Sequence, residues 1–154
     1  MSSDLWSFSL TLYARPGVEQ VCLDLQSAGA TVCLLLCAAW LEQRGVTFSQ
    51  PRLERLRQVA TPWDRDVVQP LRALRTRWKP LAQQDAALDE LRQHIKGMEL
   101  EAERELLRRL EIAAQDWPRG EAKDQLAWLD GAAAEAADLN RDALHRLRVA
   151  VTGT

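Results

Sequence analysis

The apolar run from Val32 to Leu41 constrains the fold more than any other stretch of this sequence. It reads Val-Cys-Leu-Leu-Leu-Cys-Ala-Ala-Trp-Leu, without a polar residue. Such a run is too short to cross a bilayer, which takes about 20 apolar residues in a helix. A helix that is apolar on all sides is instead buried at the centre of a protein. The run therefore predicts a central buried helix over about residues 30–44.

The rest of the chain is built from residues that favour helices. Leu, Ala, Arg, Glu and Gln dominate the composition, and all five are strong helix formers. No stretch alternates polar and apolar residues with the period of two that a half-buried strand requires. A length of 154 residues is typical of one domain. We expect an all-α, multi-helix bundle around the buried helix, in a single domain of residues 1–154.

A long amphipathic helix is predicted over about residues 84–117. Its apolar residues recur every three or four positions, which is the helical period, and we expect all of them to face inward: Leu88, Leu91, Ile95, Met98, Ala102, Leu106, Leu110, Ala113 and Trp117. At 1.5 Å per residue the helix is about 50 Å long, whereas a domain of this size is only about 40 Å across. A helical hairpin over residues 84–137 is therefore expected to project, and homodimerisation through the long helix stays open.

Prolines and capping residues predict the other boundaries. Ser3 and Asp4 are expected to begin the first helix, and Asp138 or Asn140 the last. A new helix is expected to begin at Thr61-Pro62-Trp63, with Pro70 kinking or dividing it. A further helix is expected over residues 121–137.

The motifs that mark common active sites are missing from this sequence. The two histidines, His94 and His145, are far apart, and neither a CxxC nor an HExxH metal motif is present. There is no G-x-S-x-G elbow and no Gly-rich phosphate loop. Cys33 and Cys37 are interpreted as small buried apolar residues. We therefore predict no catalytic residue, no metal and no cofactor, and do not expect an enzyme.

The cysteines and the first residues indicate a compartment. The chain has three cysteines, an odd number, all in apolar helical stretches, and Ser2-Ser3-Asp4 does not resemble a signal peptide. Reduced thiols in the cytoplasm are the simplest interpretation.

Charge is distributed unevenly along the chain. Residues 50–80 carry eight basic and three acidic side chains, whereas residues 1–49 carry two and four, and residues 81–154 carry ten and fifteen. A basic segment between acidic ones is typical of a surface for an anionic partner. It is equally consistent with pairing between this segment and the long acidic helix of the same chain.

Three functions remain open, in order of preference. The first is a non-enzymatic interaction or regulatory protein that binds a protein partner through the basic 52–79 surface, the long helix, or both. The second is nucleic-acid binding through the same Arg-rich segment. Both use the candidate contact residues Arg52, Arg55, Arg65, Arg72, Arg75 and Lys79. The third is a small-molecule-binding protein or enzyme with a pocket between the N-terminal helices, lined by Trp6, Tyr13 and Trp40.

Several short motifs resemble a family of small bacterial proteins known as a conserved domain of unknown function. Most lie in the first 45 residues: Trp6-Ser7-Phe8, Tyr13, Pro16-Gly17-Val18, Cys22-Leu23, Leu25-Gln26, Gly29, Val32, Leu34-Leu35-Leu36-Cys37-Ala38 and Trp40-Leu41. Others follow at Trp63, Pro70-Leu71-Arg72, Glu99-Leu100 and Ala102-Glu103-Arg104. The resemblance implies a cytoplasmic bacterial protein with a shared helical fold. It carries no known activity, so it assigns no catalytic residue.

Overall fold

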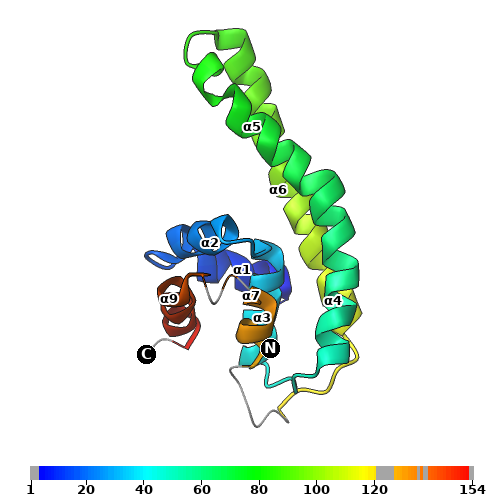
Figure 1. The fold of residues 1–154 in the computed structure, drawn as a ribbon. Helices are drawn as coiled ribbons and strands as arrows, with labels where there is room; N and C mark the ends of the chain where they lie inside the picture. The colour runs from blue at the N-terminus through cyan, green and yellow to red at the C-terminus, as the bar shows by residue number, and fades with distance from the viewer. Residues whose placement is uncertain (1–3, 121–126, 135, 137–138, 153–154) are drawn as a thin grey trace.

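The protein is all-α, as its composition predicts (Figure 1). The structure is a computed structural model that describes residues 4–120, 127–134, 136 and 139–152. Within these ranges every regular element is a helix. None of these helices is long and apolar enough to cross a membrane. The candidate N-cap residue Ser3 lies outside the described ranges. Asp4 begins the first helix, α1 (Leu5–Tyr13), and its carboxylate accepts a hydrogen bond from the Ser7 amide at 2.7 Å.

The apolar run forms the central helix, α3 (Val32–Gln43), as predicted. Every residue from Cys33 to Glu42 is buried. α3 packs against α1, α2 (Val18–Ser27), α4 (Gln50–Trp63), α6 (Ala86–Ala114), α7 (Ala127–Ala133) and α9 (Arg141–Thr152). Its C-terminal carboxylate, Glu42, is buried too, and accepts a hydrogen bond from the Leu129 amide of α7 at 2.8 Å. A helix apolar on all sides thus forms the centre of the fold because it has neighbours on every side.

Two helices that were expected to be separate form one rod in the structure. α4 contains Pro62 without a break, so the predicted helix start at Thr61 is wrong. It continues through a π-helical segment, η1 (Asp64–Val68), into α5 (Gln69–Ala82), where Pro70 lies in the first turn. Proline has no amide hydrogen to donate to the preceding turn, and a π-helical turn is one way to fit such an interruption into a helix.

The long helix α6 is continuous, including at Gly97. It begins one residue after Asp85, whose carboxylate accepts from the Leu88 amide at 3.1 Å. Its 29 residues span about 43 Å at 1.5 Å per residue. Ala102, Leu106 and Leu110 of its apolar stripe are buried, and Ala113 and Trp117, which follows the end of α6, are partly buried. Leu91 and Met98 are 52% and 51% exposed, so the prediction that the whole stripe faces inward is wrong for these two residues.

α6 pairs along its N-terminal half with α5, the helix that precedes it in the chain. These two segments extend together away from the other helices (Figure 1). We call residues 69–98 the arm, and α1, α2, α3, α7 and α9 the body. The partner expected for α6 was a helix over residues 121–137. Residues 121–126, 135 and 137 of that range lie outside the described residues. The described part forms α7, which packs mainly on α3. The arm is therefore a pair of helices that pack on each other and extend beyond the body.

The C-terminal helices complete the body. Trp128 of α7 is fully buried, and its indole Nε1 donates to the Val46 carbonyl at 2.8 Å. The Asn140 side chain caps α9 by accepting from the Ala143 amide at 3.0 Å. Of the two predicted N-cap residues, Asn140 therefore caps this helix, while Asp138 lies outside the described residues. The body is closed around α3 by α1, α2, α7 and α9.

Candidate functional site

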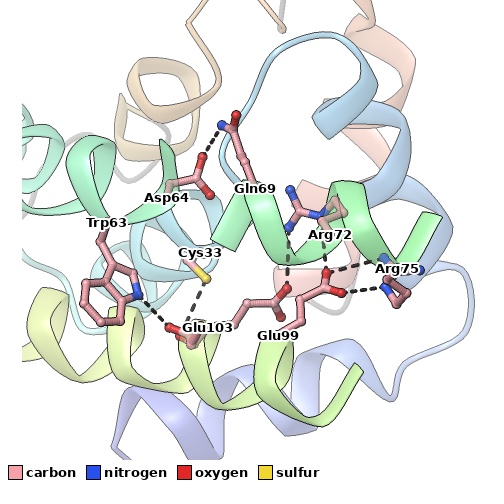
Figure 2. A network of polar contacts seen from close by, with 9 residues as sticks. Cys33, Trp63, Asp64, Gln69, Arg72, Arg75, Glu99 and Glu103 are labelled. Atoms are coloured by element: carbon pink, nitrogen blue, oxygen red, sulfur yellow. Dashed lines mark hydrogen bonds and ion pairs between the residues drawn. The ribbon is translucent and has the colours of Figure 1, made fainter. Parts of the chain in front are cut away.

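Two arginines of α5 and two glutamates of α6 form an ion-pair network where the arm meets the body (Figure 2). Arg75 holds Glu99 through two bonds, from Nε to Oε1 at 2.5 Å and from Nη2 to Oε2 at 3.4 Å. Arg72 Nε lies 3.3 Å from Glu99 Oε2, and Arg72 Nη2 lies 3.5 Å from Glu103 Oε1. The spacings of three on α5 and four on α6 place each pair on one helix face. The network therefore joins the two helices of the arm at its base.

The two carboxylates of the network differ in how well they are compensated. Glu99 is 7% exposed but pairs with both guanidinium groups. Glu103 has one long contact to Arg72. Burial, and then the neighbouring charge of Glu99, raise the pKa of Glu103 to about 7. Glu103 is thus a carboxyl group that changes its charge near neutral pH.

Side chains from the body and from the rod surround the network (Figure 2). The Cys33 thiol donates to the Glu103 carbonyl at 3.8 Å, and the Trp63 indole donates to the Ala102 carbonyl at 2.9 Å. In the orientation that satisfies its amide, Gln26 of α2 places its oxygen 2.6 Å from Arg72 Nη1. The network therefore connects α2, α3, α5 and α6.

A cavity of about 510 Å³ opens beside this network, between α1, α2, α3, α5 and α6. Its polar lining includes Ser9, Tyr13 and Lys96 in addition to the network. Its apolar lining includes Trp6, together with exposed leucines at the rim: Leu10, Leu23 and Leu100. Burial raises the pKa of Tyr13 above its ordinary value, so its hydroxyl stays protonated at neutral pH. The buried part of the lining is mixed, since Leu36 and Leu107 lie there beside the network, and the exposed part holds Glu19 and Lys96 as well as the leucines.

The six predicted basic contact residues do not form one site. Arg72 and Arg75 face the glutamates of α6, as the intramolecular alternative proposed. Arg52 donates to the Thr47 carbonyl at 2.7 Å. The other three are exposed: Arg65 pairs with the adjacent Asp66, while Arg55 lies on α4 and Lys79 on α5.

The three predicted pocket residues lie in two places. Trp6 and Tyr13 line the cavity. Trp40 is 4% exposed in the core, with the Arg44 guanidinium 4.1 Å from its ring centroid. Among the described residues, no three His, Cys, Asp or Glu side chains are grouped to hold a metal ion.

Sequence reasoning did not identify the acidic half of the network or the part that α5 and α6 play in the cavity. Glu99 and Glu103 are two of several carboxylates on the same helix, and nothing in their local spacing distinguishes them from Glu105, which forms exposed pairs with Arg108 and Arg109. The spacing of Arg72 to Arg75 and of Glu99 to Glu103 is visible in the sequence. It becomes informative only when α5 is known to pair with α6. Ser9 gave no indication of a site.

The chain belongs to the family described as "Protein of unknown function (DUF2390)", whose sequence model matches residues 4–110. This confirms the resemblance to an uncharacterised family. The matched range runs from α1 through most of α6, and so includes the whole network and every residue that lines the cavity. No curated protein and no solved structure matches the chain.

Proposed function

We propose that this protein is a non-enzymatic interaction protein whose arm binds an amphipathic helix of a protein partner. The observation that carries the proposal is an apolar strip on the side of the arm away from the body. It consists of Leu74 and Leu81 on α5 and Leu91 and Met98 on α6, and we call it the outer strip. Leu81, Leu91 and Met98 are 58%, 52% and 51% exposed, and Leu74 is half-buried.

Helix geometry places the outer strip opposite the cavity. Residues of an α-helix follow one another by about 100°. Leu74 and Leu81 therefore point about 160–180° away from Arg72, and Leu91 and Met98 about 120–140° away from Glu103. Residues seven apart share a helix face, so each helix contributes two aligned side chains. The outer strip thus runs along one side of the paired helices α5 and α6, where a third helix can pack against both.

The proposal moves the contact from the arginines of the network to the apolar side of the arm. Arg72 and Arg75 already have acidic partners within the chain. Arg77, by contrast, is exposed and has no ion pair within the described part of the chain. By helix geometry it lies between the outer strip and a hollow that it lines together with Gln26 and Thr31 of the body. A second copy of this chain would bring the same cation to the interface. An acidic flank on the partner helix complements it, which favours an acidic amphipathic helix as the occupant.

The outer strip supplies only part of the energy of a stable complex, since a dissociation constant of about 1 mM already requires about 4 kcal/mol. Full burial of a Leu or Met side chain stabilises by about 1.5–3 kcal/mol, so burying the exposed half of each contributes about 1 kcal/mol. Three such side chains supply about 3 kcal/mol, to which a salt link at Arg77 adds specificity. Loss of two side chains to charged residues should therefore lower the affinity at least about tenfold.

The test is a comparison of variants in affinity purification from the native cell, followed by binding measurements. The Leu91→Glu/Met98→Glu protein should lose a partner that the wild type and the control Leu139→Glu both retain, since Leu139 is 74% exposed outside the arm. A synthetic acidic amphipathic helix from that partner should bind the purified wild-type protein.

The second part of the test changes the charge of two exposed basic residues of α5. Arg77→Glu should weaken the binding of the peptide, whereas Lys79→Glu, on the cavity side of the same helix, should leave the binding unchanged. The proposal is wrong if the strip variant retains every partner. It is also wrong if light scattering shows a dimer that the strip variant loses, or if nucleic acid is the material retained.

A further inference from the structure

We propose that the cavity at the base of the arm binds a small amphipathic molecule with an anionic head group, such as a carboxylate on an alkyl chain. This inference is independent of the proposed partner, because the cavity and the outer strip lie on opposite sides of the arm. The cavity volume of about 510 Å³ lies within the range of about 300–1,000 Å³ that is typical of small-molecule sites.

The observation that points to a ligand is the hydroxyl group of Ser9. Ser9 lines the cavity, is 4% exposed, and its Oγ has no hydrogen-bond partner among the described residues. Buried polar groups in native proteins are nearly always hydrogen-bonded, since burial without a partner is costly. The Oγ has almost no accessible surface, so a ligand head group supplies the missing partner by displacing a side chain that covers it.

The unused hydrogen-bonding capacity of the lining favours an anion. Lys96 lines the cavity, is exposed, and has no ion pair within the described part of the chain. Arg75 commits two nitrogens to Glu99, and no partner is found there for its third, Nη1. The protonated Tyr13 hydroxyl and the Ser9 hydroxyl are further donors. Glu19 is the only acidic side chain of the lining without an ion pair in the described part of the chain. Four uncommitted donor groups thus face one uncommitted carboxylate.

Glu103 can adjust its charge to an incoming anion. Its pKa of about 7 means that an additional negative charge nearby shifts it toward the protonated form at neutral pH. The groups around it are Glu99 on its own helix, Arg72 and Arg75 on α5, Tyr13 on α1 and Cys33 on α3. Binding of an anion should therefore be accompanied by proton uptake.

The rim of the cavity suits an apolar chain. Leu10, Leu23 and Leu100 are 52%, 42% and 54% exposed, and each lines the cavity from a different helix. Exposed apolar side chains grouped at the mouth of a cavity with a partly polar lining are typical of a binding site. The head group lies inside and the chain lies against these leucines.

The experiment is isothermal titration calorimetry at pH 7 with three probes that share one chain: octanoate, octanol and octylammonium. Octanoate should bind with 1:1 stoichiometry at least tenfold more tightly than the other two. Repeating the titration in buffers of different ionisation enthalpy should show proton uptake. Equal or tighter binding of octanol or octylammonium overturns the anionic head group, and no saturable binding of any probe overturns the site.

Two variants connect binding to the named residues. Ser9→Ala removes a hydroxyl with no partner, so the fold should be retained, and octanoate should bind at least fivefold more weakly. Lys96→Ala should have a similar effect, while the control Lys79→Ala, on the same arm outside the cavity, should bind like the wild type. Thermal melting of each variant checks that it is folded. Unchanged affinity in both Ser9→Ala and Lys96→Ala overturns the proposal.

Discussion

Replacing Glu103 with glutamine should stabilise the protein above pH 7 and leave its stability nearly unchanged at pH 4. The pKa of Glu103 is raised from its ordinary value of 4.5 to about 7 by burial and by Glu99, against the opposing effect of Arg72 and Arg75. Between these two pH values the folded state holds a proton that the unfolded state has lost. Raising the pH through this window therefore destabilises the native protein, and the full cost is present above pH 7.

The size of the effect follows from the two pKa values. Their difference corresponds to about 3 kcal/mol, but the Glu103 side chain is 31% exposed, so solvent screening reduces the expected value to about 1–2 kcal/mol. Glutamine cannot ionise and retains a carbonyl oxygen that can accept from Arg72. At pH 4 the carboxyl is protonated in the native state and mostly protonated in the unfolded state, so glutamic acid and glutamine are nearly equivalent there.

The assay is urea unfolding followed by tryptophan fluorescence at pH 4 and pH 8. With a urea dependence of about 1–3 kcal/mol/M, the midpoint of Glu103→Gln should rise by about 0.5–1 M relative to the wild type at pH 8 only. Glu101→Gln is the matched control, because Glu101 is exposed on the same helix, and its midpoint should not move at either pH. A gain that is equal at both pH values, or a loss at pH 8, would refute the reasoning.

Three further predictions test the network, the backbone and the core. Glu99→Ala should lower the free energy of unfolding by about 2–3 kcal/mol, because it leaves the partly buried Arg75 guanidinium without a counter-charge and Arg72 with only its long contact to Glu103; a loss below about 0.5 kcal/mol in urea unfolding would contradict this. Gly97→Ala should raise the thermal midpoint, since nothing lies within 4 Å of the added methyl group and alanine is favoured in a helix by about 1 kcal/mol. Gly45→Ala should lower it, because φ is +69° and the added methyl group would lie 3.0 Å from the Gly120 Cα; opposite signs for these two glycines are the required result. The three cysteines should react with a thiol reagent at pH 8 only after unfolding, because burial raises the pKa of each thiol; rapid labelling of the native protein would show that the core is open.

Different parts of the fold could be predicted from the sequence to different degrees. The central helix was predictable because ten consecutive apolar residues have few alternatives to burial. The break at Thr61-Pro62 was predicted wrongly, because proline is compatible with the inside of a rod when the carbonyl groups that it leaves unpaired can be accommodated nearby. Leu91 and Met98 follow the helical period as well as the buried residues do. Periodicity identifies the apolar face of a helix but does not show how far along the helix a neighbour extends.

The sequence by itself determined that this chain is helical, which helix is central, and that its basic residues are concentrated between two acidic segments. These are local properties of composition and spacing, and they hold whatever the helices contact. Only the tertiary structure decided that α5 lies against α6, so that Arg72 and Arg75 meet Glu99 and Glu103. It also decided that Ser9 is buried beside a cavity and that the outer strip has no cover within the described residues. These outcomes depend on which helices meet and on which sides, and that choice is made by the packing of the whole chain.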